Sequence, residues 1–232
     1  MQQTWDFIKD SAKLAVRRAL VRLTKQKPAI ELLFAALEVE GYRCRDLSSL
    51  EVFGKHGLWH TTDYLHRCRS VDLWEIDPVS ARHARRLGPK VRVFCDDSIK
   101  AVQNHDARLG RYDTIVIDNQ ASPFDDWCEH FDLFPEILRC LEPGGAGVLI
   151  VNFIRSHRSD LAPPRARMHE CRRVAFYGKS SVTSREAVQT YQRHAAGLGL
   201  KIETHVTIPR NELVSYLGMV VTPAASGRAS EP

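Results

Sequence analysis

One short stretch places an acid and two glycines between a predicted strand and a predicted helix. It reads Glu51-Val52-Phe53-Gly54-Lys55-His56-Gly57, and the strand predicted over residues 46–53 leads into its glycines. Glycines let the backbone approach a bound nucleotide closely, and the start of a helix offers free N–H groups. The stretch therefore fits a nucleotide-binding turn, although an ordinary strand-to-helix turn has the same composition.

Two further acids follow the next two predicted strands. Glu75 and Asp77 end the strand predicted over 70–76, where a carboxylate can accept hydrogen bonds from both ribose hydroxyls. Asp77 stands directly before Pro78 and suits a helix N-cap, which leaves Glu75 for the ribose. Asp97 follows the strand over 91–95, where it could accept from an adenine amino group or cap the helix that begins at Ser98.

A fourth polar group follows the strand predicted over 113–118. Asp118 and Asn119 end this apolar strand, and open α/β sheets place their ligands at the carboxyl ends of strands. We therefore expect all four groups to meet at one edge of a sheet.

The elements that position these residues alternate along the chain. Short apolar strands at 46–53, 70–76, 91–95, 113–118 and 147–153 alternate with helices predicted at 61–69, 78–87, 98–108 and 131–141. This pattern predicts an α/β fold, with a mostly parallel sheet and helices on both faces. A helix over 184–198 and strands over 201–208 and 213–221 close the domain.

Two helices are predicted before the first strand. The helix over 4–27 has an apolar stripe and a basic remainder, and a second helix covers 30–40. We expect N-terminal helices over 1–41, one ligand-binding domain over 42–222 and a flexible tail over 223–232. The basic first helix packs on the sheet edge in one interpretation and lies on an anionic membrane surface in the other.

Together the strand-end features resemble the class I S-adenosylmethionine-dependent methyltransferases, over residues ~45–155 and in the closing strand pair. Leu141-Glu142-Pro143-Gly144-Gly145 is similar to the family's turn before its fifth strand. The resemblance implies a Rossmann-like sandwich whose seven-stranded sheet ends in an antiparallel pair.

The resemblance also implies S-adenosylmethionine as the cofactor and S-adenosylhomocysteine as its product. The glycine turn would hold the methionine end, Glu75 the ribose and Asp97 the adenine. The expected cofactor contacts are Glu51, Phe53, Gly54, Gly57, Glu75, Ile76, Asp97, Ser98 and Asp118. Phe53 and Lys55 depart from the family's pattern, because glycines often occupy both positions. The G-x-G-x-x-G turn of nicotinamide dehydrogenases is absent.

Methyl transfer asks mainly for positioning and exclusion of water, and a base only where the acceptor must lose a proton early. His130 and Asp118 are the predicted catalytic residues, with His56 as a second candidate base. Asp118 and Asn152 match two ligands of the metal-dependent catechol-type enzymes, but Val151 stands where the third ligand belongs, so we expect no metal. Asp118-Asn119-Gln120 also differs from the D/N-P-P-Y/F motif of enzymes that methylate amino groups of bases.

An arginine-rich stretch over 155–173 has little periodicity and is predicted to be a long loop or lid. Its arginines are predicted to bind an anionic group of the acceptor: Arg155, Arg158, Arg165 and Arg167. We predict O-methylation of a small-molecule or glycan-like acceptor. The alternatives are methylation of RNA or another macromolecule, aminopropyl transfer of the spermidine-synthase kind, and cofactor binding without catalysis.

Composition sets broad limits on these alternatives. The formal net charge is +5, which is compatible with an anionic partner but does not require one. The six cysteines are scattered, which argues against a disulfide framework. The sequence shows neither a signal peptide nor a membrane-spanning run, and we expect a cytoplasmic protein.

Overall fold

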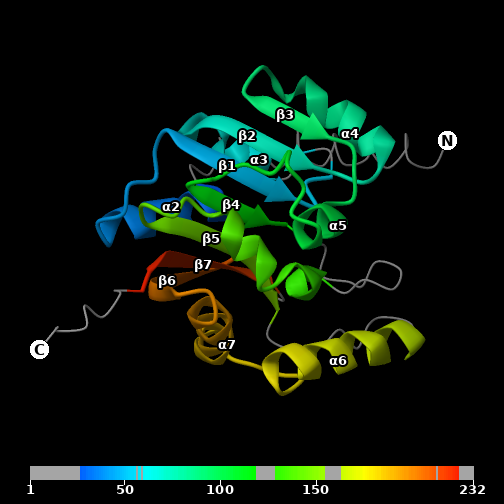
Figure 1. Ribbon diagram of the computed structural model, residues 1–232, viewed down its shortest axis with the longest axis vertical. Helices are drawn as coiled ribbons and strands as arrows, with labels where there is room; N and C mark the ends of the chain where they lie inside the picture. Colours follow the sequence, from blue (N-terminus) through cyan, green and yellow to red (C-terminus); the bar gives the residue numbers. More distant parts are fainter. Residues whose placement is uncertain are drawn as a thin grey trace, which may run out of the picture.

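The structure is a computed structural model that describes residues 27–55, 57–58, 60–118, 129–154, 163–212 and 214–224 (Figure 1). The helix predicted over 4–27 lies outside these residues except for Lys27. The predicted tail lies outside them from residue 225 onward.

Within the described residues, seven strands form one sheet in the order β3-β2-β1-β4-β5-β7-β6. The strands are β1 (Leu47–Val52), β2 (Cys68–Trp74), β3 (Val91–Phe94), β4 (Thr114–Ile117), β5 (Gly147–Ile154), β6 (Leu200–Pro209) and β7 (Val214–Pro223). The first five run parallel, and β7 lies antiparallel between β5 and β6. The predicted fold class, including the antiparallel closing pair, is confirmed.

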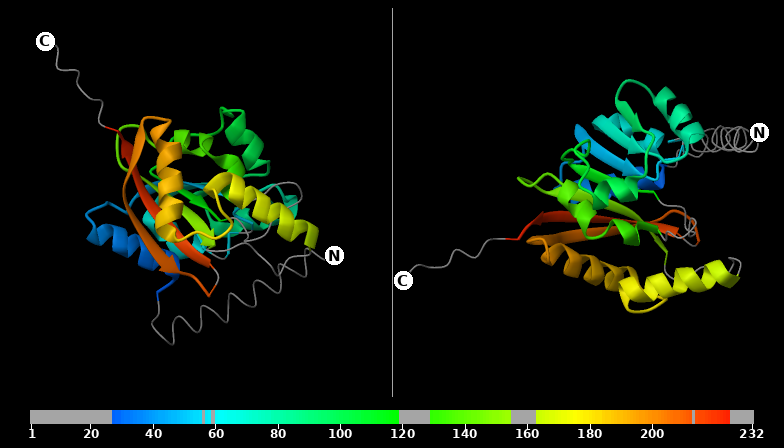
Figure 2. Two further views of the ribbon diagram at one scale, coloured as in Figure 1. Left: turned by 90° about the horizontal axis from the view of Figure 1, so that it is seen from below. Right: turned by 45° about the vertical axis from the view of Figure 1, so that its right-hand side comes forward.

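Helices cover both faces of the sheet, which explains why β4 and β5 are buried along their whole length (Figure 2). One face packs against α2 (Ala29–Val39), α3 (Thr61–Tyr64) and α4 (Pro78–Ala84). The other packs against α5 (Ser98–Gln103), the 3-10 helices η3 (Glu129–Leu133) and η4 (Glu136–Cys140), and α7 (Ser184–Ala196). Two further 3-10 helices, η1 (Leu65–Arg67) and η2 (Arg85–Leu87), extend α3 and α4.

The helix predicted over 131–141 is wrong. η3 and η4 occupy this stretch instead, and Pro135 lies between them. Proline has no N–H to donate and clashes with the preceding turn of an α-helix, so the chain forms two short 3-10 segments. The helix predicted over 98–108 ends early, because α5 stops at Gln103 and His105 adopts a positive φ of 51°.

The loop predicted over 155–173 is also wrong for its described part, because residues 163–177 form helix α6 (Pro163–Tyr177). Two prolines open the helix, where their missing N–H groups cost nothing. The buried residues of α6 are His169, Arg173 and Tyr177, four positions apart. This buried stripe is largely polar, and a search for apolar periodicity therefore overlooks it.

The edge of the sheet at which β1–β5 end is called the carboxyl edge below. In Figure 1 the arrowheads of β1 and β3 point toward this edge, and α6 extends past them on the same side; Figure 2 shows the same overhang. None of the described helices is both long and apolar enough to cross a membrane.

Candidate functional site

The turn after β1 has a left-handed backbone at two residues that are not glycine. Phe53 has φ 61° and Lys55 has φ 50°, values that side chains other than glycine adopt uncommonly but without a forbidden clash. The N–H of Gly57 donates to the carbonyl of Gly54 at 2.8 Å and closes the turn. The turn therefore tolerates the two departures from the glycine pattern.

Gly54 and Gly57 are required by packing within the protein. A Cβ at Gly54 would lie 2.7 Å from Cγ of Leu73 and 3.0 Å from Oε1 of Glu51. A Cβ at Gly57, whose φ is +68°, would lie 2.4 Å from Cδ1 of Leu87. Because neither glycine has a side chain, the turn packs directly against Leu73 of β2 and Leu87 at the end of η2.

Glu51 supports this turn from inside the protein. Its carboxylate is buried and accepts hydrogen bonds from the hydroxyls of Thr61 and Tyr64, both at 2.6 Å. Burial, followed by the charge of Glu51, raises the pKa of Tyr64. The structure thus places Glu51 behind the turn, where hydroxyls of α3 hold both of its oxygens.

Glu75 and Ile76 directly follow β2. Oε1 of Glu75 accepts from the N–H of Asp77 at 2.8 Å, and burial raises the pKa of Glu75. Asp77 caps α4 by accepting from the N–H of Ser80 at 2.8 Å, which confirms the predicted cap. Ile76 is 55% exposed beside these acids, an unusual position for a large apolar side chain.

Asp97 follows β3, the neighbour of β2, and caps α5. Its Oδ1 accepts from the N–H groups of Ile99 at 3.0 Å and of Lys100 at 3.2 Å. Its Oδ2 lies 3.6 Å from Nζ of Lys100. Ser98 begins α5 and is buried. The capping alternative for Asp97 is therefore realised, and Oδ2 is the oxygen that the cap leaves for another donor.

Asp118 lies at the carboxyl edge between side chains from two other elements. Ile117 pairs with Val151 in the sheet, which brings Asn152 beside Asp118, and the Asn152 amide donates to Asp118 Oδ1. Arg210, in the turn between β6 and β7, donates from one guanidinium nitrogen to Asp118 Oδ1 at 3.0 Å and to Asn152 Oδ1 at 3.2 Å.

His60 approaches Asp118 from the opposite side. Its Nε2 lies 2.6 Å from Asp118 Oδ2 and 3.4 Å from Glu51 Oε1. Its Nδ1 lies 3.2 Å from the hydroxyl of Tyr216. Burial lowers the pKa of His60, so the ring is neutral. Two carboxylates beside Nε2 favour a proton on that nitrogen, and Nδ1 then accepts from Tyr216.

His130 is buried in an aromatic cluster. Tyrosine hydroxyls of α6 and α7, from Tyr177 and Tyr191, contact its Nε2, and rings of Phe131, Phe134 and Phe176 surround it. These contacts join η3 to the two helices. The catalytic role of His130 stays a prediction.

The arginines predicted to bind an acceptor fall into two groups. Arg165 and Arg167 lie in the first half of α6, and the side chain of Arg167 is exposed. Arg155 and Arg158 lie outside the described residues, as do His56 and Asn119.

Sequence reasoning missed His60, Arg210 and Tyr216. The order of the strands contains a usable signal for Arg210, because β5 and β7 are antiparallel and the turn before β7 must return to the carboxyl edge. His60 stands directly before a helix that follows the glycine turn, a position that also faces this edge.

The hydrogen-bond acceptors and the exposed apolar side chain of the site fit S-adenosylmethionine. Glu75 offers carboxylate oxygens for hydroxyls, Ile76 an uncovered apolar surface for a flat base, and Asp97 an oxygen for an amino group. Across residues 27–224, outside the gaps already given, no three His, Cys, Asp or Glu side chains are grouped to hold a metal ion.

No protein-family model matches the chain, and no curated protein matches it in sequence. Solved structures do match its fold. The N1-methyltransferase of 1,6-didemethyltoxoflavin from Burkholderia thailandensis, with S-adenosylhomocysteine bound, superposes with a TM-score of 0.50 at 15% identity, over 96% of this chain and 90% of that one. TYW2 from M. jannaschii, in complex with AdoMet, has a TM-score of 0.50 at 9% identity, over 77% of this chain and 70% of that one. The chain has the Rossmann-like fold of the class I S-adenosylmethionine-dependent methyltransferases.

Proposed function

We propose that this protein binds S-adenosylmethionine at the carboxyl edge and transfers its methyl group to an acceptor. The observation that carries the proposal is an exposed apolar side chain, Ile76, next to the strand-end acids Glu75 and Asp97. Trp74 pairs with Phe94 at the ends of β2 and β3, so the two acids follow neighbouring strands. A nucleoside needs this combination of a hydroxyl acceptor, an apolar surface and an amino-group acceptor.

Each residue of the site has a part in this proposal. Glu75 accepts from the ribose hydroxyls, Asp97 from the adenine amino group, and Ile76 packs on the base. The glycine turn presents its backbone to the methionine end, with Phe53 beside it and Ser98 near the adenine. Glu51 contributes indirectly, by stabilising the glycine turn, because its two oxygens already accept hydrogen bonds from hydroxyls of α3. The bound cofactor supplies an electrophilic methyl group, and the protein positions the acceptor and excludes water.

The acceptor in this proposal is a small molecule or a glycan with an anionic group, and methylation occurs at oxygen without a metal. The position of α6 supports this choice, because the helix extends past the carboxyl edge and bears Arg165 and Arg167 (Figure 1). A guanidinium pairs well with a phosphate, sulfate or carboxylate.

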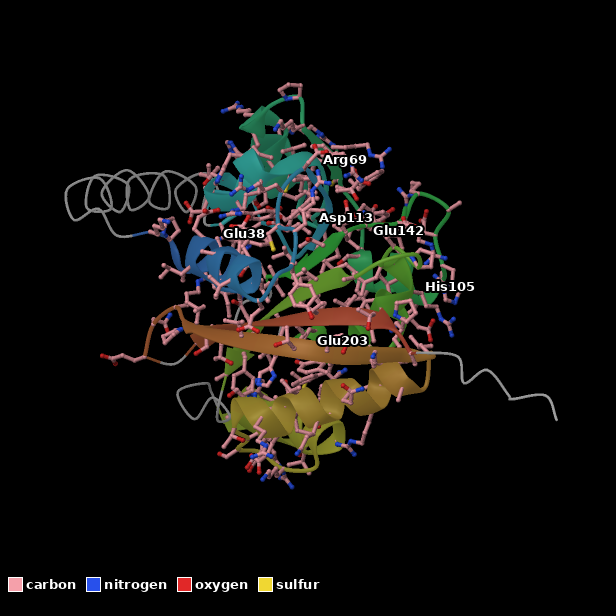
Figure 3. The ribbon with its side chains drawn as sticks, turned by 90° about the vertical axis from the view of Figure 1, so that its left-hand side faces the viewer. Glu38, Arg69, His105, Asp113, Glu142 and Glu203 are labelled. Atoms are coloured by element: carbon pink, nitrogen blue, oxygen red, sulfur yellow. The ribbon has the colours of Figure 1, made fainter. Side chains whose placement is uncertain are left out.

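Calorimetric titration with S-adenosylmethionine and S-adenosylhomocysteine tests the proposal. We expect Glu75→Gln to weaken both by about 1–3 kcal/mol, because the ribose loses a charged acceptor. Glu142→Gln is the matched control, since Glu142 is an exposed acid before β5, on the face shown in Figure 3. Absence of binding by the unmodified protein contradicts the cofactor proposal. Equal affinities in Glu75→Gln and the unmodified protein contradict the ribose assignment alone.

A further inference from the structure

The carboxylate of Asp118 is contacted by side chains from three separate parts of the chain. Asn152 of β5 and Arg210 of the β6–β7 turn contact Oδ1, and His60, which stands before α3, contacts Oδ2. This set, with Tyr216 of β7 behind His60, is called the Asp118 cluster below. Side chains this distant in sequence converge because all four elements reach the carboxyl edge.

The outer part of the cluster is electrically balanced. Asp118 is 14% exposed and Arg210 is 27% exposed, whereas His60 is buried and neutral. The guanidinium of Arg210 lies 3.0 Å from the carboxylate. A molecule arriving at this edge therefore meets a negative charge that a positive charge already offsets.

Arg210 is held in place from two directions. Its backbone N–H donates to the carbonyl of Val214 at 2.9 Å, and its guanidinium lies 5.2 Å from the ring centre of Tyr216. The hydroxyl of the same tyrosine bonds His60. Tyr216 thus links the two groups that flank Asp118.

We propose that Asp118 contacts the acceptor atom at the methyl-transfer end of the site, that His60 and Arg210 are positioning residues for its carboxylate, and that the acceptor atom is the oxygen of an uncharged hydroxyl. This inference rests on the proposed function. An uncharged donor can hydrogen-bond to Asp118 while its lone pair points away toward the methyl group. An ammonium group has no lone pair to offer the methyl carbon, and Arg210 already pairs with Asp118, so the cluster has no uncompensated negative charge for a polyamine.

The methyl transfer can be written with these groups so that each bond formed, each bond broken and the released proton are accounted for. The lone pair of the acceptor forms a bond to the methyl carbon, the carbon–sulfur bond breaks, and its electron pair stays on sulfur. The proton of the acceptor passes to the Asp118 carboxylate and then to solvent. The positioning residues keep their protons throughout.

Three ligands, the proposed cofactor, its product and one analogue, test whether Asp118 lies at the methyl-transfer end of the site. They do so without an identified acceptor. S-adenosylmethionine and sinefungin have a positive charge at the methyl-bearing position, whereas S-adenosylhomocysteine is uncharged there. Asp118→Asn should weaken the two charged ligands about 3- to 10-fold more than the uncharged one, because an opposing charge is removed. Arg210→Met should shift the same ratio in the opposite direction, and Arg210→Lys should keep it near that of the unmodified protein.

A second ion pair, at the opposite end of β4, provides the control. Asp113 lies just before β4, at the opposite end from Asp118, and its Oδ2 is 3.0 Å from a guanidinium nitrogen of Arg69. Both residues are labelled on the face shown in Figure 3, which is the side away from the carboxyl edge. Asp113→Asn and Arg69→Met should leave the ratio unchanged, and thermal unfolding identifies any variant that has lost its fold.

The outcomes separate the inference from the proposed function. If the unmodified protein binds none of the three ligands, the proposed function fails. If it binds them but Asp118→Asn and Arg210→Met leave the ratio unchanged, or shift it in one direction, the inference alone is overturned. Methyl transfer from radiolabelled S-adenosylmethionine to spermidine by the unmodified protein would also overturn it, whereas its absence agrees with it.

Discussion

Gly54 shows how a residue expected to contact a ligand can first be required by the protein's own packing. The position of its absent Cβ is 2.7 Å from Cγ and 2.9 Å from Cδ1 of Leu73, a buried side chain of β2. A side chain at this position would push the turn away from the sheet. The backbone that faces a ligand is thus placed by a contact on the opposite side of the turn.

Gly54→Ala should therefore lower the free energy of unfolding by about 1–3 kcal/mol, the usual cost of overpacking, and weaken S-adenosylhomocysteine binding. Urea unfolding and calorimetric titration measure the two effects. Gly144→Ala is the control, because a Cβ at Gly144 meets nothing within 4 Å. If Gly54→Ala is as stable as Gly144→Ala, Leu73 gives way without cost and the packing argument is wrong.

The strand-end residues also mark the limit of prediction from sequence. Pro78 identified Asp77 as the cap of α4, and the structure confirms that cap. The same reasoning left two roles open for Asp97, since a carboxylate before a helix can both cap it and bind a ligand. His60 and Arg210 were missed because their partner, Asp118, is far from both in sequence and only the fold brings the three together.

At the scale of the element, α6 is the helix that the hydropathy pattern does not predict. Arg173 is buried and donates to the carbonyl of Ser180 at 2.9 Å and to that of Ile154 at 2.7 Å. These bonds tie the end of the helix to β5 and to the segment before α7. A buried guanidinium therefore does the anchoring that an apolar side chain does in most helices.

We expect Arg173→Met to retain much of the buried volume but to leave two carbonyls without donors. The cost should be about 1–3 kcal/mol of unfolding free energy, with faster amide hydrogen exchange in α6. Arg185→Met, an exposed position in the first turn of α7, is the control and should change neither measurement. Unchanged exchange in α6 of Arg173→Met would show that the aromatic cluster alone anchors the helix.

At the scale of the whole molecule, the alternation of apolar strands and helices predicted the class of fold. The seven strands and their antiparallel closing pair came from the resemblance and are confirmed, whereas the order of the strands was not predicted and comes from the structure. The order matters for function, because parallel strands and one returning hairpin turn deliver Glu75, Asp97, Asp118 and Arg210 to a single edge. The break between η3 and η4 and the helix α6 were not predicted. Pro135 interrupts a stretch that otherwise has a helical pattern, and the buried face of α6 is largely polar where a hydropathy pattern requires apolar residues.

The stability of the whole molecule should depend on pH through two histidines, one buried and one partly buried. Burial lowers the pKa of His60 and of His194 below the ordinary value of 6.5. In the unfolded chain both histidines take up protons as the pH falls through about 6.5, whereas in the folded protein they do so only at lower pH. The unfolded state then binds more protons, and the free energy of unfolding falls.

Between pH 6.5 and pH 5.5 each such histidine should cost at most about 1 kcal/mol of unfolding free energy, measured by urea unfolding across that range. His60→Gln should be less stable at pH 7.5, since it loses contacts of the Asp118 cluster, but its stability should fall less steeply on acidification. His66→Gln should keep the full pH dependence, because His66 is 64% exposed. An equally steep fall in His60→Gln would mean that His60 takes up its proton as readily in the folded protein as in the unfolded chain, and the lowered pKa of His60 would have to be abandoned.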